Sequence, residues 1–450
     1  MSVDENGFTE DAFPVQDHMV EAFTADDLTE EGARRRDAAD PGHRDLFHVP
    51  PADGGRYAEV AYLAGNSLGL QPKATGPDLL EDLAEWARLG VEGHFEARRP
   101  WVSYPELLTE NTARLVGALP EEVVVMNTLT VNLHLLLVSF YRPRGERNRI
   151  VIEDTAFPSD SYAVRSQARF HGLDPDEAVV RLRPRPGEDT LRTEDIVDYL
   201  AREGDRVALV LLGGVNYLTG ELMDIPAITE AGRAAGAMVG WDLAHAAGNV
   251  PLRLHDWGVN FAAWCNYKYL NSGPGAIAGA FVHSRHLDDP TIQRFEGWWG
   301  NDPATRFEMT PVHRPLARAD AWQLSTPPTY AMAPIRTSLG IFAQVGMPAL
   351  RARSERLTGY LERLLDLVTA GRPITVITPR DPRRRGCQLS LRLDSGSAGA
   401  LAKRLRHEHG VITDAREPNI LRAAPTPLYS TYHDCWRFAD ALTHLVEETP

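Results

Sequence analysis

The sequence predicts an α/β protein with a large domain built on a mostly parallel sheet and a smaller α+β domain at the carboxyl end. Two observations predict this fold. Between about residues 105 and 283, short apolar runs alternate with amphipathic segments, which is the pattern of βαβ units. After about residue 330, long amphipathic helices surround one alternating strand, which is typical of a separate α+β unit.

The elements of the large domain follow from local patterns. Residues 131–141 are predicted to form a helix, and Thr128 and Thr130 are available as its N-caps. Strands and helices then alternate along the chain as strand 149–154, helix 193–204, strand 206–214, helix 225–236, strand 237–242 and strand 276–283.

The carboxyl-terminal part is predicted to hold helices over 334–346 and 350–368, a half-buried strand over 387–394, and two further helices. The charge run RDPRRRG at 380–386 is interpreted as a solvated turn. The changes of pattern divide the chain into an N-terminal arm that wraps over a later domain, a large domain and a small domain, at residues 1–54, 55–325 and 326–450.

Composition excludes several classes of function. The chain has 450 residues, with 47 Lys and Arg against 62 Asp and Glu, so its formal net charge is −15 and it offers no basic face to a nucleic acid. No apolar run approaches the roughly 18 to 20 residues of a membrane span, and the first residues have no signal or transit pattern. The three cysteines lie far apart without metal-binding spacing. We therefore expect a cytoplasmic protein without disulfides or a thiolate metal site.

The segment 240–283 carries the chemistry. Asp242 ends an apolar strand, at the edge where parallel strands place their ligands. His245 follows three residues later, and Lys268 lies in an aromatic stretch beside Tyr267. A carboxylate that keeps a ring nitrogen protonated and a lysine that forms a Schiff base are the two anchors that pyridoxal 5′-phosphate needs.

Each of these residues also has a simpler interpretation. A lone Asp at a strand end is usually a helix N-cap, and a lone His nearby is usually a hydrogen-bonded structural residue. Lys268 differs, because Lys73, Lys268 and Lys403 are the only lysines among the 47 basic residues. Since a buried, unpaired ammonium is costly, the sequence favours a functional role for Lys268.

Five short motifs carry a resemblance to a known family. They are Gly65-Asn66-Ser67-Leu68-Gly69, Phe157-Pro158-Ser159-Asp160, Asp242-Leu243-Ala244-His245, Tyr267-Lys268-Tyr269-Leu270-Asn271 and Gly297-Trp298-Trp299-Gly300. These motifs resemble those of kynureninases, and the likeness runs from about residue 55 to the end. It implies an aminotransferase-like, fold-type-I pyridoxal phosphate enzyme of tryptophan catabolism. Such an enzyme is a homodimer with active sites at the interface, and it hydrolyses L-kynurenine or 3-hydroxy-L-kynurenine to anthranilate or 3-hydroxyanthranilate and L-alanine.

The resemblance implies a catalytic role for three residues. Lys268 is implied to bind the cofactor and to act as the base at the substrate α-carbon. Asp242 is implied to pair with the pyridinium nitrogen, and Tyr267 is the candidate proton relay. His245 is implied to support the cofactor ring.

Further residues match the family's cofactor contacts. Leu129, through its backbone N–H, and Thr130 resemble the phosphate cradle, which agrees with the affinity of helix N-termini for anions. The remaining implied contacts are Phe157 stacked on the ring, Pro158, Ser159, Asp160 near the ring edge, and the phosphate contacts Tyr267, Trp298 and Thr326. Gly213 departs from the Ser of animal relatives, so one cofactor hydrogen bond is expected to be missing or taken by water.

Four residues are expected to bind the substrate. The flanks of Arg422 resemble the family segment whose Arg binds the α-carboxylate, and Arg suits a planar carboxylate. His94, Ser325 and Thr326 are expected to contact the ring. Animal enzymes that favour 3-hydroxykynurenine also have His at the position of His94. At the position of Thr326 they have Asn, where some bacterial enzymes have Thr. We therefore expect both substrates to be accepted, with the 3-hydroxy form preferred about tenfold at most.

Other functions remain open at this point. A cysteine desulfurase or an aminotransferase has the same fold, but a desulfurase needs a nucleophilic Cys on a mobile loop, and Cys265, Cys387 and Cys435 lie in apolar or strand contexts. A non-catalytic binding module of this fold is a third alternative. The intact Lys268 and Asp242 argue against it.

Overall fold

The computed structural model describes residues 23–447. Its largest sheet has seven strands in the order β2-β8-β7-β6-β5-β3-β4. In chain order these are β2 (Val123–Val125), β3 (Arg149–Glu153), β4 (Val179–Leu182), β5 (Val207–Gly213), β6 (Met238–Asp242), β7 (Phe261–Trp264) and β8 (Gly279–Val282). Strand β8 runs antiparallel to both of its neighbours, and the other neighbouring pairs are parallel. The predicted fold class, with a mostly parallel sheet, is confirmed.

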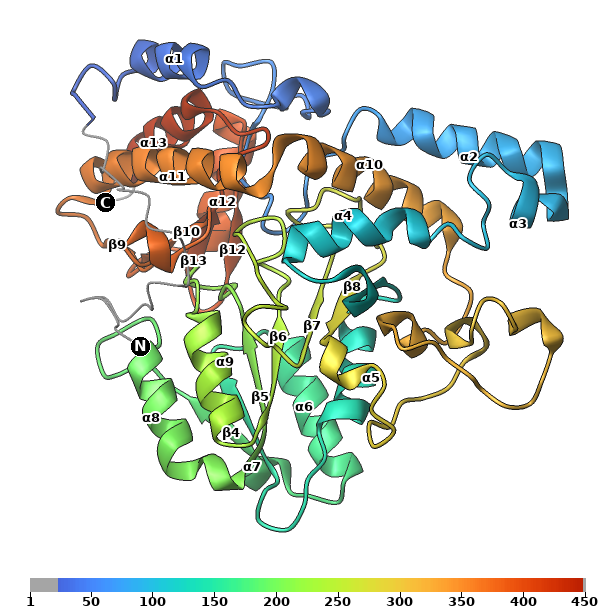
Figure 1. Ribbon diagram of the computed structural model, residues 1–450. Helices are drawn as coiled ribbons and strands as arrows, with labels where there is room; N and C mark the ends of the chain where they lie inside the picture. Colours follow the sequence, from blue (N-terminus) through green and yellow to red (C-terminus); the bar gives the residue numbers. More distant parts are fainter. Residues whose placement is uncertain (1–22, 448–450) are drawn as a thin grey trace.

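Helices cover both faces of this sheet (Figure 1). On one face lie α5 (Leu129–Phe140) and α6 (Pro158–Phe170), and on the other lie α8 (Thr193–Glu203) and α9 (Ile225–Ala234). From Leu209 to Leu212, residues of β5 alternate between the two apolar clusters that these helices form with the sheet. Burial on both faces explains why this strand is continuously apolar.

A second sheet lies in the carboxyl-terminal part. Four antiparallel strands pair in the order β12-β13-β10-β9, with bounds β9 (Ile374–Val376), β10 (Leu389–Leu393), β12 (Asp414–Arg416) and β13 (Ile420–Ala423). Their apolar core also includes side chains from α11 (Met347–Thr369), α12 (Ala398–His409) and α13 (Tyr432–Glu447). This antiparallel unit is the predicted small α+β domain, and its proposed boundary at residue 326 stays a prediction.

Segments from the amino-terminal part contact this second core. Helix α1 (Glu30–Ala39) lies against α13 (Figure 1), and β1 (Ala61–Tyr62) pairs in parallel with β11 (Val411–Ile412). Helix α10 (Thr329–Val345) packs against α2 (Thr75–Leu89) and α4 (Glu106–Val116). Residues 1–22 of the predicted arm lie outside the described residues.

Two local predictions need correction. Helix α10 begins at Thr329, with Pro334 inside it, although the proline was expected to mark the start of the helix. The run 380–386 forms a turn, but it is not simply solvated. Arg385 is 1% exposed and binds both carboxylate oxygens of Glu362, at 2.9 and 3.0 Å, because a buried guanidinium needs a charged partner.

The described residues bear on two expectations drawn from the composition. Among residues 23–447, no helix combines the length and the apolar character that a membrane crossing requires. The three cysteines are free thiols, and all are buried. Burial raises the pKa of each thiol, so none is a ready nucleophile of the kind a desulfurase uses.

Candidate active site

A cavity of about 750 Å³ lies at the carboxyl edge of the large sheet. Three adjacent strands end there, β3 at Glu153, β5 at Gly213 and β6 at Asp242, and this is the edge at which open α/β sheets bind ligands. The residues that line the cavity are Thr128, Leu129, Thr130, Glu153, Phe157, Ser159, Asp160, Gly213, Val215, Tyr217, Asp242, Ala244, His245, Tyr267 and Lys268.

Lys268 and His245 meet inside this cavity. The Nζ of Lys268 lies 3.0 Å from Nε2 of His245 and 5.9 Å from the ring centres of Phe157 and Tyr267. Burial, with the nearby charge of Lys268, holds the pKa of His245 well below its usual value. The neutral imidazole therefore accepts a hydrogen bond from the amine, and its buried Nδ1 has no partner among the described residues.

Asp242 and Asp160 form a pair of buried carboxyl groups. One oxygen of Asp242 accepts the backbone N–H of Ala244 at 2.7 Å. Burial raises the pKa of both carboxyl groups, and the charge of Asp242 raises that of Asp160 further, well above its usual value. The Ala244 N–H, the charge of Lys268 and a hydrogen bond from Asp160 favour the ionised form of Asp242. Since two close carboxylates do not both ionise, Asp160 keeps its proton and donates a hydrogen bond to Asp242, which carries the charge.

The amino terminus of α5 faces the same cavity. Thr128 occupies the N-cap position, but its side chain makes no capping hydrogen bond. Asn127 turns the backbone with φ at 48°, and the Asn127 side chain donates to Asn132 at 3.0 Å. The first N–H groups of a helix have no intrahelical acceptor, so this end suits a phosphate.

The residues present fit pyridoxal phosphate. The cavity combines an amine at Lys268, an ionised carboxylate at Asp242, a helix amino terminus at Leu129 and an exposed aromatic ring at Phe157. The unpartnered Nδ1 of His245 adds a polar atom that a bound group can satisfy. Each part of the cofactor, namely aldehyde, ring nitrogen, phosphate and ring face, has a matching group.

Arg422 borders the site but does not line it. It lies on β13, is 1% exposed, and binds Asp414 with Nε at 2.7 Å and the carbonyl of Tyr217 with Nη1 at 2.6 Å. Tyr217 lines the cavity. Arg422 is therefore a buried residue and not an ordinary surface charge, and its role in binding a carboxylate stays a prediction.

Other predicted residues lie apart from this cavity within the chain. His94 in α3 (Gly93–Glu96) packs edge-on against Trp101, with ring centres 5.2 Å apart. Trp298 is 43% exposed and donates from its indole N–H to the carbonyl of Arg306 at 3.0 Å. Three further predicted residues are exposed and do not line the cavity, namely Pro158, Ser325 and Thr326.

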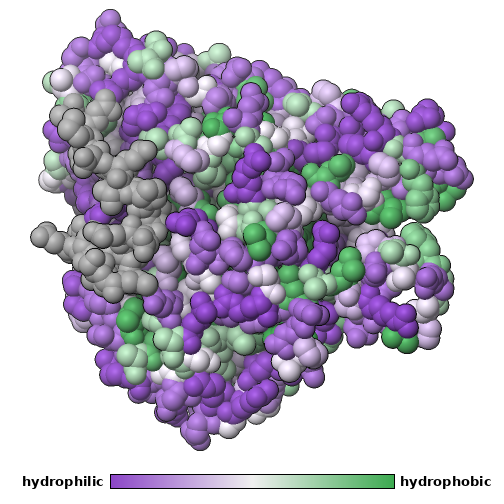
Figure 2. Space-filling view, viewed as in Figure 1, coloured by the Kyte–Doolittle hydropathy of each residue, from purple (hydrophilic) through white to green (hydrophobic). Residues whose placement is uncertain are grey.

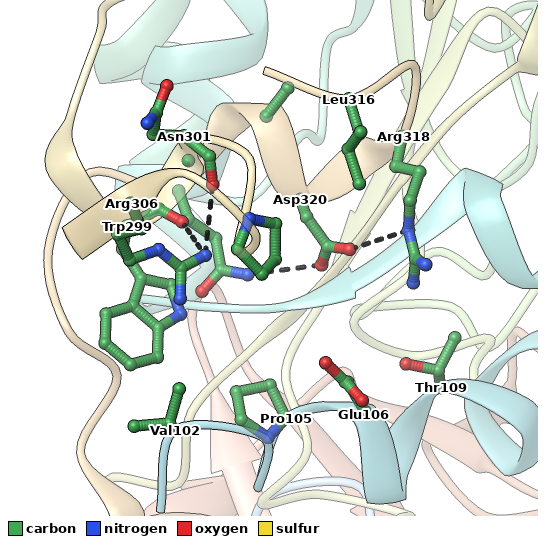
Figure 3. A pocket seen from close by; sticks show the side chains of 14 residues that line it. Val102, Pro105, Glu106, Thr109, Trp299, Asn301, Arg306, Leu316, Arg318 and Asp320 are labelled. Atoms are coloured by element: carbon green, nitrogen blue, oxygen red, sulfur yellow. Dashed lines mark hydrogen bonds and ion pairs between the residues drawn. The ribbon is translucent and has the colours of Figure 1, made fainter. Parts of the chain in front are cut away.

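A second cavity, of about 530 Å³, lies between α4 and the segment 299–323 (Figure 3). Asp320 is held there by Arg318 at 3.0 Å and Gln323 at 3.2 Å. Arg306 donates to the carbonyls of Trp299 and Asn301 and stacks over the Trp299 ring at 4.3 Å. These contacts brace the segment that follows Trp298, and no predicted site residue lines this cavity.

Several lining residues were not singled out from the sequence. Glu153 ends β3 in the structure, as Asp242 ends β6, but the predicted strand ran one residue further, to Asp154, so the strand-end rule did not select Glu153. Thr128 was considered only as a helix cap and Gly213 only as a departure. Val215, Tyr217 and Ala244 follow strand ends, but nothing in their residue types distinguishes them.

Comparison with known proteins identifies the family. A sequence profile described as the kynureninase C-terminal domain matches residues 350–442. The chain is 74% identical to a kynureninase of Salinispora tropica over 93% of this chain and 97% of that protein. It is 57% identical to a kynureninase of Myxococcus xanthus, over 92% and 96% of the two chains. The chain belongs to the kynureninase family.

Solved structures agree on the fold. A cysteine desulfurase of Escherichia coli matches with a TM-score of 0.72 at 18% identity, over 90% of this chain and 98% of that one. A cysteine desulfurase of Thermococcus onnurineus matches with a TM-score of 0.71 at 16% identity, over 86% and 95%. At this identity the likeness shows the fold alone. As a member of the kynureninase family, the chain is a pyridoxal phosphate-dependent hydrolase that cleaves a carbon–carbon bond.

Proposed function

We propose that this kynureninase-family chain hydrolyses L-kynurenine and 3-hydroxy-L-kynurenine to the corresponding anthranilate and L-alanine at the cavity around Lys268. The observation that carries the assignment of the site is the convergence of Lys268, His245 and the Asp242–Asp160 pair in one cavity. The family membership supports the choice of reaction.

The chain's own groups have separate tasks in this reaction. Bound pyridoxal phosphate supplies an electron-withdrawing ring that stabilises negative charge at the substrate α-carbon. Asp242 holds a proton at the ring nitrogen, and Phe157 covers a ring face and excludes water. Lys268 moves the α-proton, and neutral His245 accepts a hydrogen bond from its amine. Burial raises the pKa of the Tyr267 phenol, so this side chain stays protonated and can donate a proton during turnover.

Product analysis by mass spectrometry tests this proposal. With either kynurenine, we expect equal amounts of an anthranilate and alanine. An aminotransferase would instead form a keto acid and no alanine, and a desulfurase would release alanine and sulfur from cysteine. Either result would replace the proposed reaction by one of these alternatives.

We also propose that the protein is a homodimer whose subunits complete each other's sites. Trp298, Ser325 and Thr326 are exposed and lie outside the cavity of their own chain, although the resemblance implies contacts with cofactor and substrate. Figure 2 shows hydrophobic surface on the two projections at its right. The exposed large hydrophobic side chains of the chain include Phe95 at 62% and Met309 at 72%. A second copy would cover them, and sedimentation of the purified protein measures the oligomeric state directly.

A cytoplasmic location stays a prediction.

Arg422→Lys is expected to raise the KM for kynurenine about tenfold, with a smaller effect on kcat, because a point charge does not reproduce bidentate carboxylate binding. Arg416→Lys is the matched control, since Arg416 binds the same Asp414 at 3.1 Å but is 35% exposed in its side chain. Steady-state kinetics of both variants provide the comparison. A normal KM in the Arg422 variant would remove this residue from the substrate site.

His94→Phe is expected to shift the ratio of kcat/KM values toward unsubstituted kynurenine by about tenfold at most, because one neutral hydrogen bond to the ring hydroxyl contributes about 0.5 to 1.5 kcal/mol. Trp101→Phe serves as the control, since it alters the ring packed against His94 and keeps the imidazole. If the ratio changes equally in both variants, His94 acts through packing and does not contact the hydroxyl.

A further inference from the structure

Gly213 leaves space for a neighbouring side chain at the base of the cavity. It ends the middle of three adjacent strands, with Asp242 directly beside it in register. A Cβ placed on Gly213 would lie 3.1 Å from Oε1 of Glu153, closer than ordinary packing allows. The carboxyl group of Glu153 therefore extends over Gly213, toward the strand that carries Asp242.

Glu153 is enclosed by other acidic groups. The side chain is 3% exposed, and it accepts hydrogen bonds from the Gly213 backbone and the Asn216 side chain. Its Oε2 is buried and has no partner among residues 23–447. The titratable groups around it are Asp242, Asp160 beyond Asp242, and Glu221, which is 3% exposed and paired with Arg384 at 2.7 Å.

Charge balance limits which of these carboxyl groups ionise. Asp242 and Asp160 both face the cation Lys268. Glu221 is paired with Arg384, and burial nevertheless raises the pKa of Glu221 to about 7. In the described part of the chain, no cation is paired with Glu153. Close carboxylates in a dry site do not all ionise, and an uncharged acid is the form that a buried, unpaired oxygen favours.

We propose that Glu153 is a positioning residue: as an uncharged carboxylic acid lying over Gly213, it keeps the negative charge of the cluster on Asp242, which faces the cofactor ring nitrogen. The statement that Asp242 faces the cofactor ring nitrogen rests on the proposed function. The protonation state of Glu153 does not depend on that function, because it is a property of the chain without cofactor or substrate.

The pKa of Glu153 agrees with this geometry, since burial and the charge of Glu221 raise it from 4.5 to about 8. Between these two values the folded protein binds a proton that the unfolded chain has lost. Stability contributed by this proton is complete below pH 4.5 and disappears as the pH rises to about 8. Burying Glu153 therefore weakens folding at neutral pH.

The first test measures thermal unfolding of the cofactor-free full chain as a function of pH. Glu153→Gln keeps the shape and removes the titration, so its midpoint should exceed that of the unmodified protein by about 2 °C or more near pH 8. The difference should disappear toward pH 4.5. Equal stability at all pH values, or a loss at neutral pH, would show that Glu153 is not buried as an acid and would overturn the proposal.

Glu122→Gln is the matched control, because Glu122 is also fully buried in the large domain but its pKa is lowered. Hydrogen bonds from Leu119, His255 and Ser284 favour its ionised form. Stability from a lowered pKa is present above the unfolded value and is lost as the pH falls. This variant should therefore be less stable than the unmodified protein at neutral pH, the opposite sign to Glu153→Gln.

The second test measures the affinity of the full chain for pyridoxal phosphate by titration. Glu153→Ala should weaken binding about tenfold, since it removes the group that holds the base of the cavity. Glu153→Gln should restore most of that loss, because an uncharged acid is replaced by an uncharged amide. A Gln variant as weak as the Ala variant would mean that Glu153 acts as an anion. Normal affinity in the Ala variant would mean that Glu153 does not act on Asp242. If the Ala variant does not fold, Glu153→Met takes its place in this test.

Discussion

Replacing Lys268 by alanine is expected to lower turnover at least about a thousandfold while the fold survives, because this amine both binds the cofactor and moves the α-proton. Lys268 is the one lysine that lines the cavity, and its Nζ lies 3.0 Å from Nε2 of the neutral His245. The side chain is half-buried without an ion pair of its own in the described part of the chain, so little folding energy depends on it.

Borohydride reduction of the cofactor-loaded protein, followed by peptide mapping, identifies the attachment site directly. The pyridoxyl group should appear on the peptide that contains Lys268 and be absent from the alanine variant. Lys403→Ala, on α12, is the control and should behave as the unmodified protein. An adduct on Lys73 or Lys403 would contradict the assignment.

Asp242→Ala is expected to lose most activity and part of the bound cofactor. The ring nitrogen would lose the charge that keeps it protonated, and an unprotonated ring withdraws electrons poorly. Removing one member of a buried charged pair lowers the stability of the folded protein by about 3 to 5 kcal/mol. Asp160 would also lose the acceptor of its hydrogen bond.

Asp242→Asn separates charge from shape, because an amide oxygen can still accept the N–H of Ala244. Both variants should be slow, and the Asn variant should keep more cofactor. The measurements are kcat and the cofactor content of the purified protein. Turnover like that of the unmodified protein in either variant would show that Asp242 does not face the ring nitrogen.

The sequence was sufficient for the parts of the site that follow from strand ends. Asp242 could be predicted because an acidic residue ended an apolar strand, and Lys268 because lysine is rare in this chain. The approach of Lys268 to His245 across 23 residues depends on how the loop returns to the sheet, which no local pattern encodes.

Contacts between distant elements could not be predicted in this way. The binding of Arg422 to Tyr217 joins residues far apart in the chain, and the position of Glu153 over Gly213 depends on strand order. The charged turn at 380–386 was misjudged for the same reason, since the partner of its Arg385 lies on α11. The charge of a segment indicates how well the segment itself is hydrated. It does not indicate which groups from elsewhere in the chain pack against it.

Hydrolysis of kynurenine in water labelled with a heavy oxygen isotope most directly tests the claim that the cavity around Lys268 catalyses hydrolytic carbon–carbon cleavage. If the cavity around Lys268 adds water to the γ-carbonyl and breaks the neighbouring carbon–carbon bond, one heavy oxygen should appear in the carboxylate of anthranilate and none in alanine. Mass spectrometry of both products, with Lys268→Ala as the inactive control, reads out this pattern. Anthranilate without the label, or label in alanine, would contradict the account.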